Sequence, residues 1–185
     1  MQNTKDILTY TFRVSPEMFR RALYFNTFFK QRIQVTLVIV MWTMGLGLVA
    51  ANLICQIEMS SVMQLCYVVL LVTLPLLVFS CEHGYRQYKA SDASKKMRTV
   101  TLGKEWIKFR IGGAPESEKV EWRQMAGAFE LERMFILYRD SNLMVIIPKD
   151  VVPDDEMDTL RGILGLKLGR SFRIREGGLV SALCG

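Results

Sequence analysis

Histidine occurs once in this chain of 185 residues, and its four cysteines include no C-x-x-C pair. A zinc site needs three or four ligands close together, so His83 alone does not predict one. No glycine-rich loop is followed by the lysine of a phosphate-binding motif, and no serine has the flanking glycines of a nucleophile elbow. We therefore expect a protein that is not an enzyme and that holds no metal or cofactor.

Charge is absent over two long stretches, Ile33 to Ile57 and Met59 to Cys81, and Glu58 is the one charged residue between them. About 20 apolar helical residues span the hydrocarbon core of a bilayer, and both runs are rich in Leu, Val and Ile. Helices of this length in soluble proteins usually keep a polar stripe, which neither run shows. The sequence therefore predicts a transmembrane helical hairpin over 33–81 that turns at Glu58. A pair of buried core helices is the alternative.

Basic residues flank the predicted hairpin, with Lys30 and Arg32 before it and Arg86 and Lys89 after it. By the positive-inside rule, this distribution predicts a multi-pass protein of the bacterial cytoplasmic (inner) membrane with both termini in the cytoplasm. The same four side chains are expected to contact lipid headgroups, in addition to setting topology. The net charge of +6 gathers at the ends of the apolar runs, so we expect the lipid bilayer as a partner and no nucleic acid. We expect no signal peptide, because no small-residue cleavage site follows the first run.

The first 32 residues predict a strand and then an amphipathic helix. Residues 8–14 alternate between apolar and polar types, as a strand does. Ser15 and Pro16 are typical of the first positions of a helix, which we expect to lie at the membrane surface and to lead into the first span. After the hairpin, residues 82–97 are polar and basic and predict a linker helix.

Residues 98–168 predict a compact β-rich domain in the cytoplasm. Apolar alternation and turn residues indicate strands, and an acidic first turn indicates a helix after them; the strands are expected at 98–103, 106–112, 119–124, 128–133, 134–140 and 143–148, and the helix at 152–165. With the strand over 8–14, the count matches an antiparallel, pleckstrin-homology-like domain that ends in a helix and is interrupted by the hairpin. The fold class expected is thus α+β, with the strands at both ends of the insertion paired. Residues 169–185 predict a flexible tail.

Three short motifs and the helix after them resemble the YcxB-like family of small bacterial two-span membrane proteins. The motifs are "VEWRQM" around Trp122, "FILYRD" at 135–140 and "VIIPK" at 145–149, and an acidic amphipathic helix follows. The resemblance extends to about Leu168 and implies two adjacent spans with a cytoplasmic domain at the C-terminus. It implies no catalytic residue. The sequence departs from the family at "PKDVVP", where the family has an aromatic residue soon after the Pro-Lys pair.

The function expected is that of a non-enzymatic inner-membrane protein whose cytoplasmic domain binds a protein or a lipid, as an immunity or accessory factor would. Trp106, Trp122 and Tyr138 are candidate partner contacts, and core packing is the alternative for them. A subunit of a transporter, channel or enzyme complex is the alternative function.

Two further patterns in the sequence concern helix packing and the exposed face of a predicted strand. Gly47 and Ala51 are spaced for close helix approach, either to the second span or in a homodimer. Glu130 and Glu132 alternate along one predicted strand, so we expect both on a solvated face.

Overall fold

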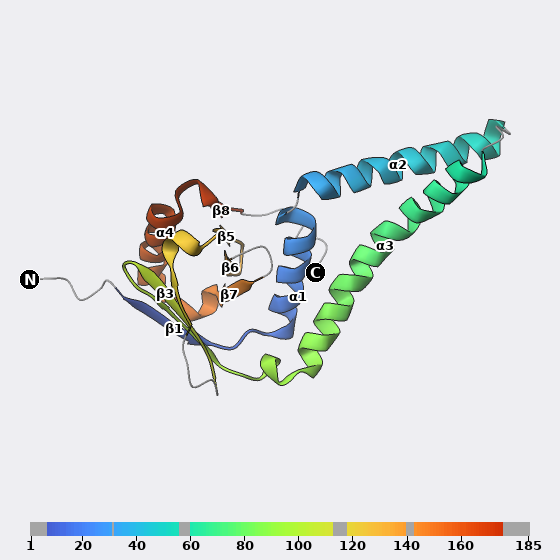
Figure 1. Ribbon diagram of the computed structural model, residues 1–185. Helices are drawn as coiled ribbons and strands as arrows, with labels where there is room; N and C mark the ends of the chain where they lie inside the picture. Colours follow the sequence, from blue (N-terminus) through green and yellow to red (C-terminus); the bar gives the residue numbers. More distant parts are fainter. Residues whose placement is uncertain (1–6, 31, 56–59, 113–117, 140–142, 176–185) are drawn as a thin grey trace, which may run out of the picture. The chain divides into compact units, whose positions relative to one another are not determined.

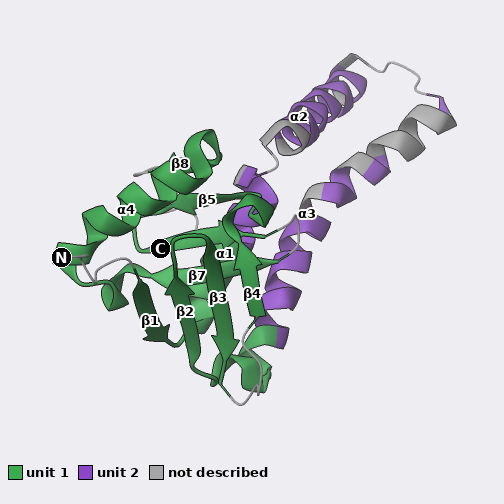
Figure 2. Cartoon of the chain, turned by 60° about the vertical axis from the view of Figure 1, so that its left-hand side comes forward, with its two compact units in different colours: residues 1–22, 88–185 green, residues 23–87 purple. Residues whose placement is uncertain are grey.

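A computed structural model describes residues 7–30, 32–55, 60–112, 118–139 and 143–175 (Figure 1). The turn predicted at Glu58 lies outside the described residues, as do residues 176–185 of the predicted tail. The chain forms two compact units (Figure 2). Unit 1 comprises residues 1–22 and 88–185, and unit 2 comprises residues 23–87.

The first sheet of unit 1, sheet A, joins the beginning of the chain to its second half. Its strands are β1 (Leu8–Phe12), β2 (Arg98–Leu102), β3 (Trp106–Ile111) and β4 (Glu118–Glu121), in that order and all antiparallel. Leu8 lies opposite Leu102, and Phe12 lies opposite Arg98. The predicted pairing of the two strands that flank the helical insertion is therefore confirmed.

The second sheet of unit 1, sheet B, has a buried central strand. Its order is β7 (Met144–Pro148), β6 (Met134–Tyr138), β5 (Gly127–Glu130) and β8 (Phe172–Ile174). All five residues of β6 are buried, which is typical of a strand that is covered on both faces. The 3₁₀ helix η3 (Trp122–Gln124) lies between β4 and β5 in the chain and so connects the two sheets.

The helix α4 (Asp154–Leu168) follows β7 and a 3₁₀ turn, η4 (Lys149–Val151). Its first turn carries Asp154, Asp155 and Glu156, and acids there favour helix formation by interacting with the helix dipole. Leu160 and Leu164, one turn apart, are fully buried. The hydroxyl of Tyr10 in β1 donates a hydrogen bond to Glu156 Oε2 at 3.0 Å, which links α4 to sheet A.

The prediction of an antiparallel, pleckstrin-homology-like domain that ends in a helix is wrong: the α+β chain has two four-stranded sheets, one of them contains a parallel pair, and a strand follows the last helix. The helix passes Gly165 and ends at Leu168, and the φ of 51° at the following Gly169 lets the chain change direction. A 3₁₀ turn, η5 (Gly169–Ser171), then leads into β8, which pairs with β5 in parallel. Residues 169–175 are therefore part of the folded structure of unit 1, whereas the prediction placed them in a flexible tail. They could not be recognised from periodicity because β8 is only three residues long.

Four α-helices are described in all, and two of them, α2 and α3, lie wholly or mostly in unit 2. The predicted helix start is confirmed: the Met18 N–H donates to Ser15 Oγ at 3.2 Å at the beginning of α1 (Pro16–Phe25). A π-helical segment, η1 (Asn26–Lys30), leads toward α2 (Arg32–Cys55). The long α3 (Ser61–Ala90) continues through residues 82–90, so the first part of the predicted linker helix over 82–97 is the end of α3, and the short η2 (Asp92–Ser94) follows it.

Among the described residues, no helix combines the length and the apolar character that a membrane crossing requires. The predicted transmembrane hairpin over 33–81 is therefore wrong. The multi-pass location in an inner membrane and the cytoplasmic placement of both termini depended on that hairpin, and they are corrected with it. The lipid bilayer as a partner stays a prediction.

The hairpin prediction used the absence of charge and the Leu, Val and Ile content of the two runs, neither of which shows where a helix ends. Uncharged polar residues such as Thr43 and Asn52 lie within α2. In α3, Thr73 and Pro75 interrupt the apolar run, and the same helix then continues into a charged end that begins at Glu82. The charge-free runs of the sequence and the helices of the structure therefore have different boundaries.

Candidate functional site

The solvent-facing side of sheet A carries a polar and basic surface that strand alternation creates. Side chains of successive strand residues point to opposite faces, and Leu8, Val100, Leu102, Ile107 and Val120 point to the buried face. The opposite positions form what we call the outer face: Thr9, Thr11, Thr99, Thr101, Trp106, Lys108, Arg110, Lys119 and Glu121. Hydrogen bonds join its threonines in cross-strand pairs, Thr9 with Thr101 at 3.3 Å and Thr11 with Thr99 at 3.0 Å.

Trp106 is the large aromatic side chain of the outer face, and it is only half-buried. Lys108 and Lys119 lie directly opposite each other on β3 and β4, an arrangement of like charges that costs free energy. Their Nζ atoms lie 5.0 and 5.2 Å from the centre of the Trp106 ring. The negative face of an indole attracts an ammonium group, so the ring offsets part of that repulsion and holds two positive charges side by side.

Gly103 brings the two tryptophans of unit 1 together. Its carbonyl oxygen accepts a hydrogen bond of 2.8 Å from the Trp122 indole N–H, and its own N–H donates to the Trp106 carbonyl oxygen at 2.8 Å. A Cβ on Gly103 would lie 3.0–3.1 Å from atoms of the Trp106 ring. Glycine is therefore needed here because the indole lies directly against the backbone.

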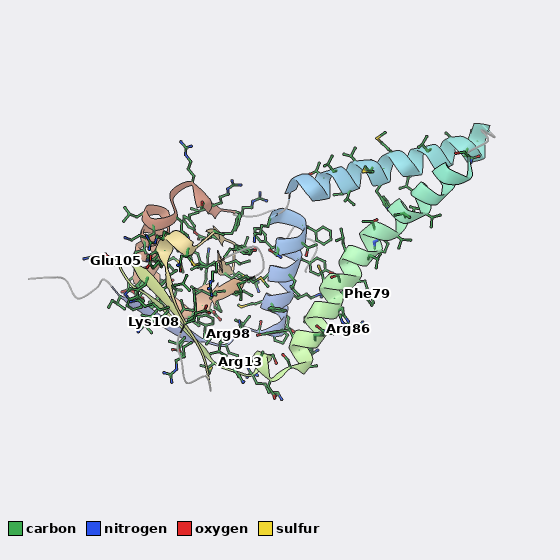
Figure 3. All side chains as sticks on the ribbon, viewed as in Figure 1. Arg13, Phe79, Arg86, Arg98, Glu105 and Lys108 are labelled. Carbon is green, nitrogen blue, oxygen red and sulfur yellow. The ribbon has the colours of Figure 1, made fainter. Side chains whose placement is uncertain are left out.

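A hollow of about 400 Å³ lies beside Trp106 in unit 1. We call it the Trp106 hollow. Residues of the β2–β3 turn, of β3 and β4, of η3 and of the end of α4 line it: Lys104, Glu105, Trp106, Lys119, Glu121, Trp122, Arg123 and Lys167. Figure 3 labels Glu105 and Lys108, which lie in the chain on either side of Trp106. The lining thus combines two aromatic side chains with four basic and two acidic ones.

The structure brings together two of the three predicted partner contacts. Trp106 and Trp122 both line the Trp106 hollow, although Trp122 is only 5% exposed and its indole N–H is already bonded. Tyr138 is 1% exposed in the central strand of sheet B, and burial raises the pKa of its hydroxyl. A side chain buried to this degree cannot contact a partner, so core packing is the correct interpretation for Tyr138.

The four basic residues predicted to contact lipid headgroups lie in three elements of the structure. Lys30 ends η1 and Arg32 begins α2, whereas Arg86 and Lys89 are exposed on the last turns of α3 (Figure 3 labels Arg86). Contact of these four residues with lipid headgroups stays a prediction.

A second cluster of charges is buried in unit 1, around Glu130 at the end of β5. Glu130 is 0% exposed. Its Oε1 accepts hydrogen bonds from Lys149 Nζ at 2.6 Å and from Arg161 Nη2 at 2.7 Å, and Arg161 Nε lies 3.1 Å from Oε2. The backbone carbonyl of Glu130 accepts from the Arg175 N–H at 2.8 Å. One residue therefore joins β5 to η4, α4 and the segment after β8.

Electrostatics keep Glu130 ionised in its buried position. Burial alone raises the pKa of a carboxyl group, but the hydrogen bonds from Arg161 and Lys149 and the positive charges of both outweigh it, so that the pKa of Glu130 is lowered. The same contact raises the pKa of Arg161. The prediction that Glu130 and Glu132 share a solvated face is wrong for Glu130, whereas Glu132 is exposed.

Sequence reasoning missed Lys108, Lys119 and the Glu130 cluster. The alternation W-K-R in β3 does place Trp106, Lys108 and Arg110 on one face. Lys119 could not be added, because only the register of β3 against β4 places it opposite Lys108. Glu130, Lys149 and Arg161 are far apart in the chain and meet only through the packing of α4 against sheet B.

The helices of unit 2 expose a different surface. Many of the described side chains of α2 and α3 are large, apolar and exposed: Leu37, Ile39, Val40, Met41, Met44, Leu46, Leu48, Ile54, Val68, Val69, Val72, Leu76, Val78 and Phe79. Exposed apolar side chains in such number are typical of contact surfaces. They carry no charge that would select a partner, and for this reason the functional proposal is built on Trp106.

No group of three or more His, Cys, Asp or Glu residues in the described ranges could hold a metal ion. The expectation of a protein without metal or cofactor stays a prediction. No family model, no curated protein and no solved structure matches this chain. The resemblance to the YcxB-like family therefore also stays a prediction.

Replacing Gly103 with alanine is expected to displace the Trp106 ring, because the added methyl group would lie 3.0–3.1 Å from ring atoms. We expect a loss of about 1–3 kcal/mol in the free energy of unfolding and a changed emission spectrum. The measurement is tryptophan fluorescence of the full chain with Trp42→Phe, so that both remaining indoles lie in unit 1. Gly162→Ala, where a Cβ has nothing within 4 Å, is the control. An unchanged spectrum for Gly103→Ala would show that Trp106 does not depend on Gly103.

Proposed function

We propose that this chain is a non-enzymatic protein that binds a negatively charged surface of another protein through the outer face of sheet A, with Trp106 at the centre of the contact. The observation that supports the proposal best is Trp106 itself. It is a half-buried indole on a sheet face, held in place by Gly103 and accompanied by two lysines. Tryptophan is among the residues that contribute most free energy to protein interfaces.

Two further features support a protein as the partner. The hydroxyl groups of the paired threonines supply hydrogen-bonding groups around the indole, as the polar rim of an interface does. The charge of the outer face is positive, since Lys108, Arg110 and Lys119 outnumber Glu121, and complementary charge steers association and selects partners. The immunity or accessory role expected from the sequence is one form of this proposal, because both roles require binding to a protein.

Site-specific crosslinking in the cells that make the protein tests the proposal. A photoreactive amino acid is placed at Thr101, which lies opposite Lys108 on the outer face, and at Arg173, which is exposed on β8. We expect a discrete adduct from position 101 and none of the same mass from position 173. Trp106→Ala should weaken the adduct about tenfold or more, as expected for a residue that dominates an interface.

Two charge-reversal variants test, in the same experiment, whether the adduct depends on the charge of the outer face. Lys108→Glu should weaken the adduct, whereas Lys96→Glu, an equal change at an exposed residue outside the outer face, should leave it unchanged. The proposal is wrong if the adduct at position 101 survives both Trp106→Ala and Lys108→Glu.

A further inference from the structure

We infer that the Trp106 hollow binds carboxylate side chains of a short acidic segment of the partner. The inference rests on the proposed function and adds the chemical class of the group that the hollow accepts. Its volume of about 400 Å³ lies in the lower part of the range of ligand pockets, roughly 300–1,000 Å³. A hollow of that size accepts side chains rather than a folded element.

The charges of the lining favour an anion of modest charge. Lys104, Lys119, Arg123 and Lys167 face Glu105 and Glu121, so the basic residues exceed the acidic ones by two. Arg123 and Glu121 form an ion pair of 2.5 Å with each other, which reduces the contribution of both to a ligand. The excess of positive charge therefore comes from lysines, each of which is a point charge on a flexible stem.

Carboxylates fit this lining better than phosphates do. The planar fork of arginine matches carboxylate and phosphate oxygens alike, and the arginine of the hollow is already paired, so the charge of the ligand decides between the two. Glu105 and Glu121 would repel a doubly charged phosphate more strongly than a singly charged carboxylate.

Nucleic acid is the less favoured ligand because of the position of the indole. Binding of single-stranded nucleic acid relies on bases that stack on exposed aromatic faces. The Trp106 ring lies against Gly103, and two ammonium groups lie over it at 5.0 and 5.2 Å. A base could stack on this ring only by displacing contacts that the fold already makes.

Fluorescence anisotropy with labelled hexaglutamate and hexaglutamine peptides tests the inference on the full chain. We expect the hexaglutamate peptide to bind, more weakly as salt is added, and the hexaglutamine peptide not to bind. Lys119→Gln and Lys167→Gln should each lower the affinity about two- to fivefold, the effect of losing an exposed charge pair. Lys96→Gln removes the same charge outside the hollow and should leave the affinity unchanged.

Several outcomes would overturn the inference. It fails if both peptides bind equally, if Lys96→Gln weakens binding as much as Lys119→Gln, or if inorganic phosphate or a single-stranded oligonucleotide displaces hexaglutamate at lower concentration than free glutamate peptide does. Should hexaglutamate fail to bind while the crosslink at position 101 still depends on Trp106, only the acidic class of ligand is wrong. Loss of both results would overturn the proposed function as well.

Discussion

Replacing Glu130 with alanine is expected to lower the free energy of unfolding by about 3–5 kcal/mol, the cost of removing one partner from a buried ion pair. The carboxylate is fully buried and accepts hydrogen bonds from Lys149 and Arg161. Without it, two positive charges would face each other at the junction of sheet B and α4. Urea unfolding of the full chain, followed by tryptophan fluorescence in the Trp42→Phe background, measures the change.

Glu132 supplies the matched control for this prediction. It is an acid two residues away and is exposed, so Glu132→Ala should change the free energy of unfolding by no more than about 0.5 kcal/mol. Equal losses for both variants would contradict the role assigned to the buried cluster.

The same carboxylate makes stability depend on pH in a defined direction. Its pKa is lowered in the folded chain from the ordinary value of 4.5, so the folded state favours the charged form. The resulting stabilisation is fully present above pH 4.5 and is lost as the pH falls through that value toward the lowered pKa. Glu130→Gln cannot titrate, and the difference in stability between the wild-type chain and this variant should therefore shrink on acidification. A difference that stays constant or grows would contradict the assignment.

Replacing Gly127 with alanine is the second change with a large expected effect. A Cβ at this position would lie 2.7 Å from the carbonyl oxygen of Ser171, and the φ of 157° is one that L side chains rarely adopt. The obstacle is backbone, which cannot rotate away as a side chain can, so β8 would have to separate from β5. We expect a loss of about 1–3 kcal/mol or more in the free energy of unfolding and faster amide hydrogen exchange in residues 172–174.

Gly162→Ala provides a control that is expected to raise the free energy of unfolding rather than lower it. Gly162 is exposed on α4, and a Cβ there would meet nothing within 4 Å. Alanine at such a position should stabilise the chain by about 0.4–1 kcal/mol, because it restricts the unfolded chain more than glycine does. If Gly127→Ala were as well tolerated as Gly162→Ala, the close contact between β5 and Ser171 would not exist in solution.

Local patterns in the sequence located most elements of unit 1 correctly. The alternation of residues 8–14 placed β1, and the predicted strands over 98–103, 106–112 and 143–148 agree with β2, β3 and β7 to within one residue. Ser15 and Pro16 marked the beginning of α1 correctly. These predictions succeeded because a strand or a helix start depends on neighbours in the chain, which the sequence lists directly.

The pairing of β1 with β2 across the insertion was predicted correctly, but other predictions that required more than neighbouring residues failed. The two charge-free apolar runs within 33–81 were taken as evidence of two membrane spans, and the described helices do not supply a span. Tyr138 was a candidate partner contact because of its residue type, but all of β6 is buried. β8 was missed because three residues carry no periodicity and its pairing with β5 is parallel, across a helix.

By itself, the sequence determined which segments form β1 to β7 and which side chains alternate between the two faces of sheet A, because backbone preference and burial of apolar side chains act over a few residues. Only the tertiary structure decided that Lys119 lies opposite Lys108 beside Trp106, and that Glu130 is buried between Lys149 and Arg161. Strand register and helix packing bring these residues together from distant parts of the chain. The free energy of each contact depends on the distance between the groups and on their burial, and neither quantity can be obtained from the order of residues alone.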